Sequence, residues 1–243
     1  MKIDVLGSSS SGNCYIIEDQ GQKLILEAGV HIMEIKKALN FDIHDVAGCL
    51  VSHIHMDHSK SMVELMNLGI NVGSGIETMQ NIDHHRKNVL EPQKLHRIGN
   101  FTVMPFEIDH DVKNFGYVIK CPSGKKILFA TDTQFLMHRF EGINIYMLEC
   151  NFDMDSMRKA VKCGKLDPMI LIRVANTHMS LETLLSYLQN VDLSTTEKIM
   201  LIHLSERNSN EEKYIKAVQE QTGIETIAAD TGVVVETLDS PGF

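Results

Sequence analysis

The sequence lacks the features that would place it in a membrane or outside the cell. No apolar run approaches the roughly eighteen residues that a membrane-spanning helix needs. The first residues enter a strand-like pattern without an apolar leader, so we expect no signal peptide. The five cysteines are odd in number and show no CxxC spacing, which indicates reduced, mostly buried thiols. Together these absences predict a cytoplasmic protein with no membrane segment.

An excess of positive charge is also missing. The chain has 23 Lys and Arg against 32 Asp and Glu, a net charge of −9. This excludes a broad basic surface for nucleic acid. A nucleic-acid substrate stays possible, because bound divalent metals can supply positive charge locally. No repeat, low-complexity tract or Pro/Ser-rich linker divides the 243 residues, so we expect one domain spanning residues 1–243.

Short apolar runs separated by turn residues predict a strand-rich chain. The predicted strands are residues 2–6, 14–18, 23–26, 47–52, 101–108, 116–121, 126–130, 143–148, 198–202, 226–228 and 233–238. Apolar residues at helical spacing and helix-stop residues predict helices at 32–39, 59–68, 181–190 and 210–221. Two strand-rich halves that carry helices indicate two sheets packed face to face, with the helices outside.

Histidine is what the sequence has in quantity, and the placement of these residues is informative. Three of the twelve histidines fall within six residues, in His53-Ile54-His55-Met56-Asp57-His58. On an extended backbone His53 and His55 point to one face, whereas Asp57 and His58 lie at the turn into a helix and project differently. This pattern favours two adjacent metal ions over one. Imidazole and carboxylate together favour zinc, iron or manganese over calcium or magnesium.

Three further polar residues follow predicted strands, where loops gather chemical groups around a rigid frame. They are His110, Asp132 and His203. Each alone could be a cap, a turn residue or a core residue. Together they complete one site, in which the Asp132 carboxylate can bridge two ions.

Other interpretations of these segments are weaker. The cluster could be a solvated loop that happens to be rich in histidine. A Ser-His-Asp site could use Ser52, Ser59 and Asp57, but neither serine lies in a nucleophile-elbow sequence. The serine-rich segment 8–11 lacks the lysine of a phosphate loop and opens no helix, so we expect a tight hairpin turn close to the site. His84-His85-Arg86 fits a solvated loop better than a polyanion contact.

In their order along the chain, the motifs resemble those of the metallo-β-lactamase superfamily. They are Leu6-Gly7-Ser8-Ser9-Ser10-Ser11-Gly12-Asn13-Cys14, the segments around His53, His110 and Asp132, Thr177-His178-Met179-Ser180 and His203-Leu204-Ser205-Glu206. More narrowly, the chain resembles the small YycJ-type members, which are similar to the nuclease core of ribonucleases J and Z. The resemblance implies an α+β fold, a four-layer αββα sandwich with the site at one sheet edge.

The resemblance also implies how the ligands are shared between two divalent ions, zinc or manganese. The first ion would be held by His53, His55, His110 and Asp132. The second would be held by Asp57, His58, Asp132 and His203, with Asp132 bridging. Such ions lower the pKa of a shared water to about 7 for zinc. Asp57 would orient that water. His178 is the candidate proton donor or phosphate contact, and a capping loop residue is its simpler interpretation.

The sequence therefore predicts a dinuclear metal-dependent hydrolase. Our first hypothesis is a phosphodiesterase or nuclease that acts on DNA or RNA ends through a metal-bound hydroxide. The alternatives are a hydrolase of a small thioester, lactone or β-lactam, and a metal-binding protein without catalysis. Glu27 stands where many relatives carry aspartate, and Phe152 stands where YycJ-type sequences usually carry histidine. The short segment from Asp132 to His203 leaves no room for the inserted domain of ribonuclease J, so processive threading of a single strand is not expected.

Overall fold

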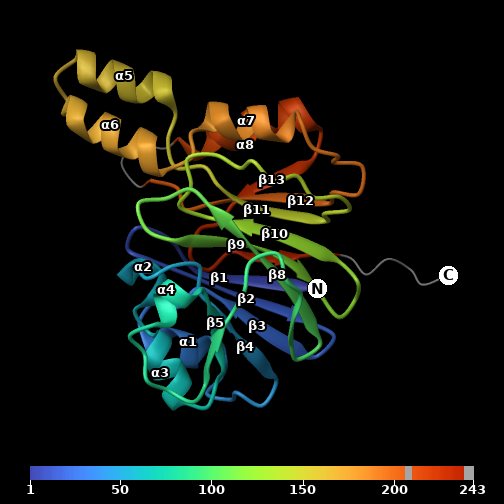
Figure 1. Ribbon diagram of the computed structural model, residues 1–243. Coiled ribbons are helices and arrows are strands. Elements are labelled where there is room, and N and C mark those ends of the chain that lie inside the picture. The colour runs from blue at the N-terminus through green and yellow to red at the C-terminus, as the bar shows by residue number, and fades with distance from the viewer. Residues whose placement is uncertain (206–209, 238–243) are drawn as a thin grey trace.

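Two sheets face each other across the centre of the molecule in the computed structural model, which describes residues 1–205 and 210–237 (Figure 1). The first sheet has the order β14-β1-β2-β3-β4-β5-β6 and the second the order β13-β12-β11-β10-β9-β8-β7. The strands of the first sheet are β1 (Lys2–Ser9), β2 (Gly12–Asp19), β3 (Gln22–Leu26), β4 (Val46–Leu50), β5 (Val72–Ser74), β6 (Lys87–Val89) and β14 (Val234–Glu236). Those of the second are β7 (His96–Ile98), β8 (Phe101–Ile108), β9 (Asn114–Lys120), β10 (Lys126–Ala130), β11 (Ile145–Glu149), β12 (Lys198–Ile202) and β13 (Glu225–Ala228).

Helices cover the outer faces of both sheets, which gives the four αββα layers (Figure 1). The described helices are α1 (Ile32–Ala38), α2 (Met56–Ser59), α3 (Met62–Asn67), α4 (Ile76–Met79), α5 (Met154–Lys162), α6 (Pro168–Thr177), α7 (Leu181–Leu188) and α8 (Glu211–Thr222). Leu184 of α7 and Tyr214 of α8 pack on the second sheet, and Leu65 of α3 packs on the first. The α5–α6 hairpin projects away from this body (Figure 1).

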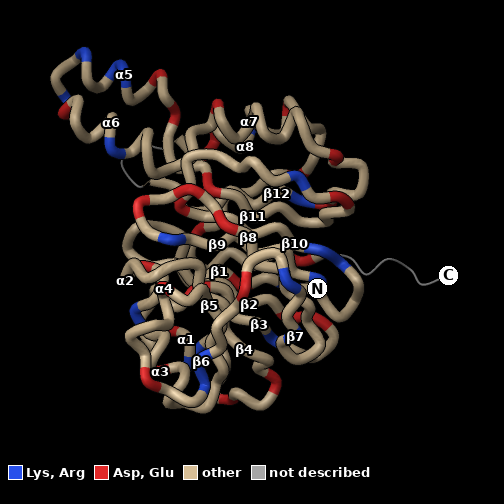
Figure 2. The backbone as a smooth tube through the Cα atoms, viewed as in Figure 1, with Lys and Arg blue, Asp and Glu red and all other residues tan. Residues whose placement is uncertain are grey.

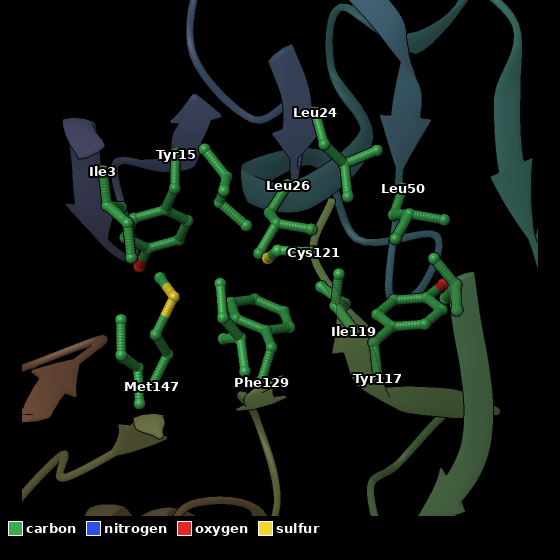
Figure 3. Packing of buried hydrophobic residues seen from close by; sticks show 14 of the residues in the cluster. Ile3, Tyr15, Leu24, Leu26, Leu50, Tyr117, Ile119, Cys121, Phe129 and Met147 are labelled. Atoms are coloured by element: carbon green, nitrogen blue, oxygen red, sulfur yellow. The ribbon is translucent and has the colours of Figure 1, made fainter. Parts of the chain in front are cut away.

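The main core lies between the two sheets, where alternate residues of each strand point inward. Tyr15 from β2 and Phe129 from β10 meet edge to face with ring centroids 5.8 Å apart (Figure 3). The buried Tyr117 hydroxyl donates a hydrogen bond to the Val51 carbonyl at 2.6 Å, so its burial leaves no unsatisfied polar group. This packing holds the two sheets, and the loops that follow their strands, in fixed relation.

The parallel strands of the two sheets end at a common edge, and polar residues follow them there. In the first sheet β3, β4 and β5 run parallel, and Glu27 and His53 lie just beyond β3 and β4. In the second, β10, β11 and β12 run parallel, with Asp132 and His203 just beyond β10 and β12. The predicted fold and the predicted clustering at strand ends are thus both present.

Some predicted elements differ from those observed. Residues 59–68 form not one helix but α2 and α3, because the Ser61 N–H and hydroxyl bind the Ala28 and Val30 carbonyls at 2.8 and 2.6 Å. Helices α5 and α6 are not among the predicted ones. The last predicted strand, 233–238, is β14, and Leu238, like Glu206 of the last motif, lies outside the described residues.

The cysteines are all free, as the sequence predicts. Cys14, Cys49, Cys121 and Cys150 are buried, and Cys163 is exposed. Burial raises the pKa of the Cys121 thiol to about 12, so this side chain stays protonated and inert. Among the described residues, no helix combines the length and the apolar character that a membrane crossing demands.

Candidate metal centre

The first predicted ligand group converges on one point. His55 Nδ1 lies 3.0 Å from His53 Nε2 and 3.4 Å from His110 Nε2. Asp132 Oδ2 lies 3.5 Å from His53 Nε2 and 3.7 Å from His110 Nε2. Tetrahedral zinc with bonds of about 2.0–2.1 Å places its ligand atoms roughly 3.3–3.4 Å apart. These four separations lie close to that value, and all four atoms lie within 4.8 Å of one another, so they could surround a single ion. This donor set is one that zinc and manganese accept.

The second predicted group shares Asp132 with the first. His58 Nε2 lies 3.2 Å from Asp132 Oδ2 and 3.3 Å from Asp57 Oδ2. His203 Nε2 lies 3.6 Å from Asp57 Oδ2, and this buried nitrogen has no hydrogen-bond partner among the described residues. A buried nitrogen without a partner is costly, and an ion at this position would satisfy it. All seven predicted ligand side chains thus fall into two groups that could each hold an ion and that meet at Asp132.

Neighbouring groups contact the second ring nitrogen of several candidate ligand histidines, as is usual around metal ligands. Ser52 Oγ lies 2.9 Å from His53 Nδ1, and the Thr177 carbonyl accepts from His110 Nδ1 at 3.2 Å. The buried Glu27 carboxylate lies 3.5 Å from His58 Nδ1 and accepts the Ser52 N–H at 3.2 Å through both oxygens. The longer side chain at position 27 therefore still reaches the loop that carries the ligands.

Glu149 is the residue that the sequence patterns missed. Its fully buried carboxylate (0% exposed) accepts from four groups. Oε1 lies 2.7 Å from His178 Nδ1 and 2.9 Å from His203 Nδ1. Oε2 accepts the N–H groups of Thr133 and Met179 at 3.0 and 3.1 Å. Its position at the end of β11, the strand between those that precede Asp132 and His203, is the signal that could have identified it.

Three residues around the centre adopt left-handed backbone conformations. Glu27, Asp132 and His203 have φ of 64°, 51° and 52°. Such a conformation costs free energy in residues other than glycine and persists only where the surroundings impose it. Here the Asn114 amide donates to the Asp132 carbonyl at 2.9 Å, and the His203 N–H donates to Ser8 Oγ at 2.9 Å.

The serine-rich turn lies close to the site, as we expected, and its residues form hydrogen bonds with residues of the two ligand groups. Ser8 Oγ lies 2.7 Å from the Tyr15 hydroxyl, and it also accepts the His203 N–H. The Asn13 amide donates to the Asp57 carbonyl at 3.2 Å and lies 3.2 Å from His58 Nε2. Residues 84–86, by contrast, precede β6, which runs parallel to β5, and so lie at the opposite end of the sheet.

Burial and neighbouring charges set the protonation of the centre. Burial lowers the pKa of His53 well below its ordinary value, and the nearby His58 adds to this. Burial opposes ionisation of Asp132, but His203 and His58 hold the pKa of its carboxyl well below its usual range. Burial likewise opposes charge on His58 and His203, but Asp132 raises the pKa of each. An ion would therefore meet a neutral His53 and an ionised Asp132, and would displace protons from His58 and His203.

His178 lies beside the centre rather than within the two predicted groups. It ends α6, and its ring stacks on that of His203 with centroids 5.4 Å apart. Burial alone would lower its pKa, but the adjacent Glu149 carboxylate raises it. The side chain, 21% exposed, lines a cavity of about 260 Å³. Phe152 is buried with Met157 and Val174 at the base of the α5–α6 hairpin, where it contributes packing.

Comparisons with known proteins agree with this fold. The Beta-lactamase superfamily domain matches residues 26–204. An exodeoxyribonuclease, WalJ, of Streptococcus pneumoniae is 26% identical over 97% of this chain and 91% of its own. An exodeoxyribonuclease, YycJ, of Bacillus anthracis is 26% identical over 87% of this chain and 85% of its own. The crystal structure of the metallo-beta-lactamase fold protein YhfI from Bacillus subtilis superposes with a TM-score of 0.75, at 16% identity, over 97% of this chain and 99% of that protein. The chain has this fold, carries a cluster of histidines and aspartates at one edge of the sheets and matches the family over most of its length. It therefore belongs to the beta-lactamase superfamily.

Proposed function

We propose that this chain is a metal-dependent exodeoxyribonuclease that hydrolyses phosphodiester bonds at DNA ends. The observation that carries the proposal is the pair of ligand groups that meet at Asp132, flanked by the Glu149–His178 pair. The names of the Streptococcus and Bacillus relatives, which match over most of both chains, support the same reaction.

Two divalent ions, zinc or manganese, fit the two groups. His53, His55, His110 and Asp132 would hold the first ion, and Asp57, His58, Asp132 and His203 the second. When bound, such ions supply Lewis-acid chemistry, because they lower the pKa of water and neutralise charge on a phosphodiester.

The residues of the chain orient the reactants and move the proton. Asp57 Oδ2 faces His58 and His203, so its carboxylate stands where it can direct a water toward phosphorus. Glu149 holds His178 through Nδ1, and no described residue hydrogen-bonds Nε2. The ring lines the cavity beside the centre, so we assign Nε2 as the donor of a proton to the leaving oxygen.

We expect His178→Ala to slow DNA hydrolysis by about 10²–10⁴-fold, the usual contribution of general acid catalysis. Hydrolysis of bis-(p-nitrophenyl) phosphate should fall by less than about tenfold, because a p-nitrophenolate needs no proton to leave. Metal content should be unchanged. The matched control is His138→Ala, because the His138 ring stacks on Phe140 and belongs to neither ligand group. Equal losses on both substrates would show that His178 is structural, and full DNA turnover would remove it from the reaction.

The proposed function is tested by metal analysis together with cleavage of end-labelled DNA. We expect about two zinc or manganese ions per chain and release of nucleotides from one end of the labelled strand. Labelled RNA, a thioester, a lactone and nitrocefin serve as competing substrates. Turnover of one of the small molecules without cleavage of DNA would assign the centre to small-molecule hydrolysis. Fewer than two ions and no turnover of any substrate would leave a metal-binding protein without catalysis.

A further inference from the structure

The α5–α6 hairpin differs in charge from the rest of the chain. Residues 154–177 contain five basic and two acidic side chains, a net charge of +3 in a chain whose total is −9. Figure 2 shows positions of Lys and Arg, in blue, along both helices of the hairpin. The five cations are Arg158, Lys159, Lys162, Lys165 and Arg173.

These cations contribute little to the fold beyond the favourable position of Lys159 and Lys162 in the last turn of α5. All five are exposed, and none forms an ion pair with any residue that the structure describes. Other exposed cations do pair, for example Lys213 with Asp153 at 2.8 Å and Lys113 with Glu107 at 3.4 Å. Unpaired like charges repel one another, so gathering them on a projecting segment costs some stability. A polyanionic partner would offset that cost.

The hairpin is joined directly to the metal centre. Thr177, the last residue of α6, accepts the hydrogen bond from His110 Nδ1, and His178 follows it. Ile170 and Arg173 of α6 line the same cavity as His178 and His203. Met169 and Ile172 are 68% and 52% exposed on this helix, so it presents apolar as well as basic side chains to a ligand. A strand whose end lies in the centre would therefore pass beside α6.

From these observations we infer that the α5–α6 hairpin is a DNA-binding arm, an inference that rests on the proposed function. Its exposed cations hold the phosphates that follow the scissile end, and Arg173 and Ile170 contact the terminal nucleotide in the cavity. Helix α5, which carries Arg158, Lys159 and Lys162, has nine residues and is about 14 Å long. One strand of a duplex carries a phosphate every 3.4 Å or so, and the arm therefore spans about four phosphates.

The test is a variant with four glutamines, Arg158→Gln, Lys159→Gln, Lys162→Gln and Lys165→Gln, in the full-length metal-loaded protein. The matched control changes charge equally at the exposed Lys37, Lys94, Lys120 and Lys216, which lie outside the hairpin. Binding of a fluorescent 20-base-pair DNA with phosphorothioate linkages at its ends, to suppress cleavage, is followed by anisotropy at several salt concentrations. For the arm variant we expect at least tenfold weaker binding at low salt. The slope of log K against log salt should become shallower by about 3.6, since each of the four lost contacts removes about 0.9.

The result that overturns the inference is an arm variant that binds like the control, with the same slope. A wild-type protein that does not bind the DNA at all overturns it equally. Thermal unfolding and metal content of both variants confirm that the comparison is between folded proteins. The two proposals fail separately. If the wild-type protein cleaves DNA and both variants bind DNA alike, the DNA-binding role of the arm is rejected and the proposed nuclease function is retained. If the wild-type protein binds DNA through the arm and cleaves none, the proposed function is rejected and the DNA-binding role of the arm is retained.

Discussion

Asp132→Asn should disrupt metal binding at both ligand groups while leaving the fold in place. Asp132 is the one side chain that belongs to both ligand groups, and its carboxylate lies 3.2 Å from His58 Nε2 and 3.0 Å from His203 Nδ1. Asparagine keeps the shape and, unlike most residues, tolerates the left-handed backbone found here. The neutral amide is a poor ligand, so we expect the metal content to fall from about two ions to one or fewer. Losing several kcal/mol of charge stabilisation lowers DNA hydrolysis by about 10³-fold or more.

Elemental analysis and cleavage of end-labelled DNA measure these two effects on the same preparation. The matched control is Asp109→Asn, which makes the same change at an exposed carboxylate one residue before His110. Asp109 belongs to neither group, so the control should keep both ions and at least half of the activity. If Asp132→Asn retains two ions and wild-type turnover, the assignment of a shared carboxylate is wrong.

Gly29→Ala should have an effect of similar size for a purely steric reason. A Cβ at position 29 would lie 1.7 Å from the Asp57 carbonyl oxygen and 2.8 Å from the Asn13 nitrogen. Both are backbone atoms, so the turn that carries Asp57 and His58 must move for the methyl group to fit. We expect about 3 kcal/mol or more of destabilisation, which corresponds to a melting temperature roughly 6–12 °C lower. Because the ligands move with that turn, the second ion and DNA hydrolysis should be lost as well.

Gly124→Ala separates the steric clash from the general cost of replacing a glycine. Gly124 has a φ of +92°, and a Cβ there would meet nothing within 4 Å. Its substitution should cost only the strain of a left-handed alanine, about 1–2 kcal/mol, with metal content and activity preserved. Thermal unfolding and metal analysis compare the two variants. A Gly29→Ala protein that melts and binds metal like wild type would show that the two loops are not in the contact described.

The clustering of the candidate ligands was predictable because each of them follows a recognisable strand or lies in one dense motif. The apolar strands before Asp132 and His203 are plain in the sequence, and parallel pairing then brings their ends together. Glu149 follows the same rule, but one carboxylate without histidines around it gives no distinct signal. Helix α6 escaped prediction because Met169 and Ile172 are exposed, so its apolar residues do not mark one buried face. The break between α2 and α3 depends on the contact of Ser61 with Val30, which local patterns do not contain.

The bond between the Ser8 hydroxyl and the His203 backbone joins residues 195 positions apart in the chain. During synthesis at about 5–20 residues per second, the segment with His203 emerges roughly 10–40 seconds after the first hairpin. Until then the site lacks His203 and the hydrogen bond from Ser8 that positions this residue. Strand β1 also lacks its neighbour β14. Contacts between such distant segments also slow folding. The second ligand group, which includes His203, is therefore expected to bind its ion only after this late segment has emerged and folded against β1.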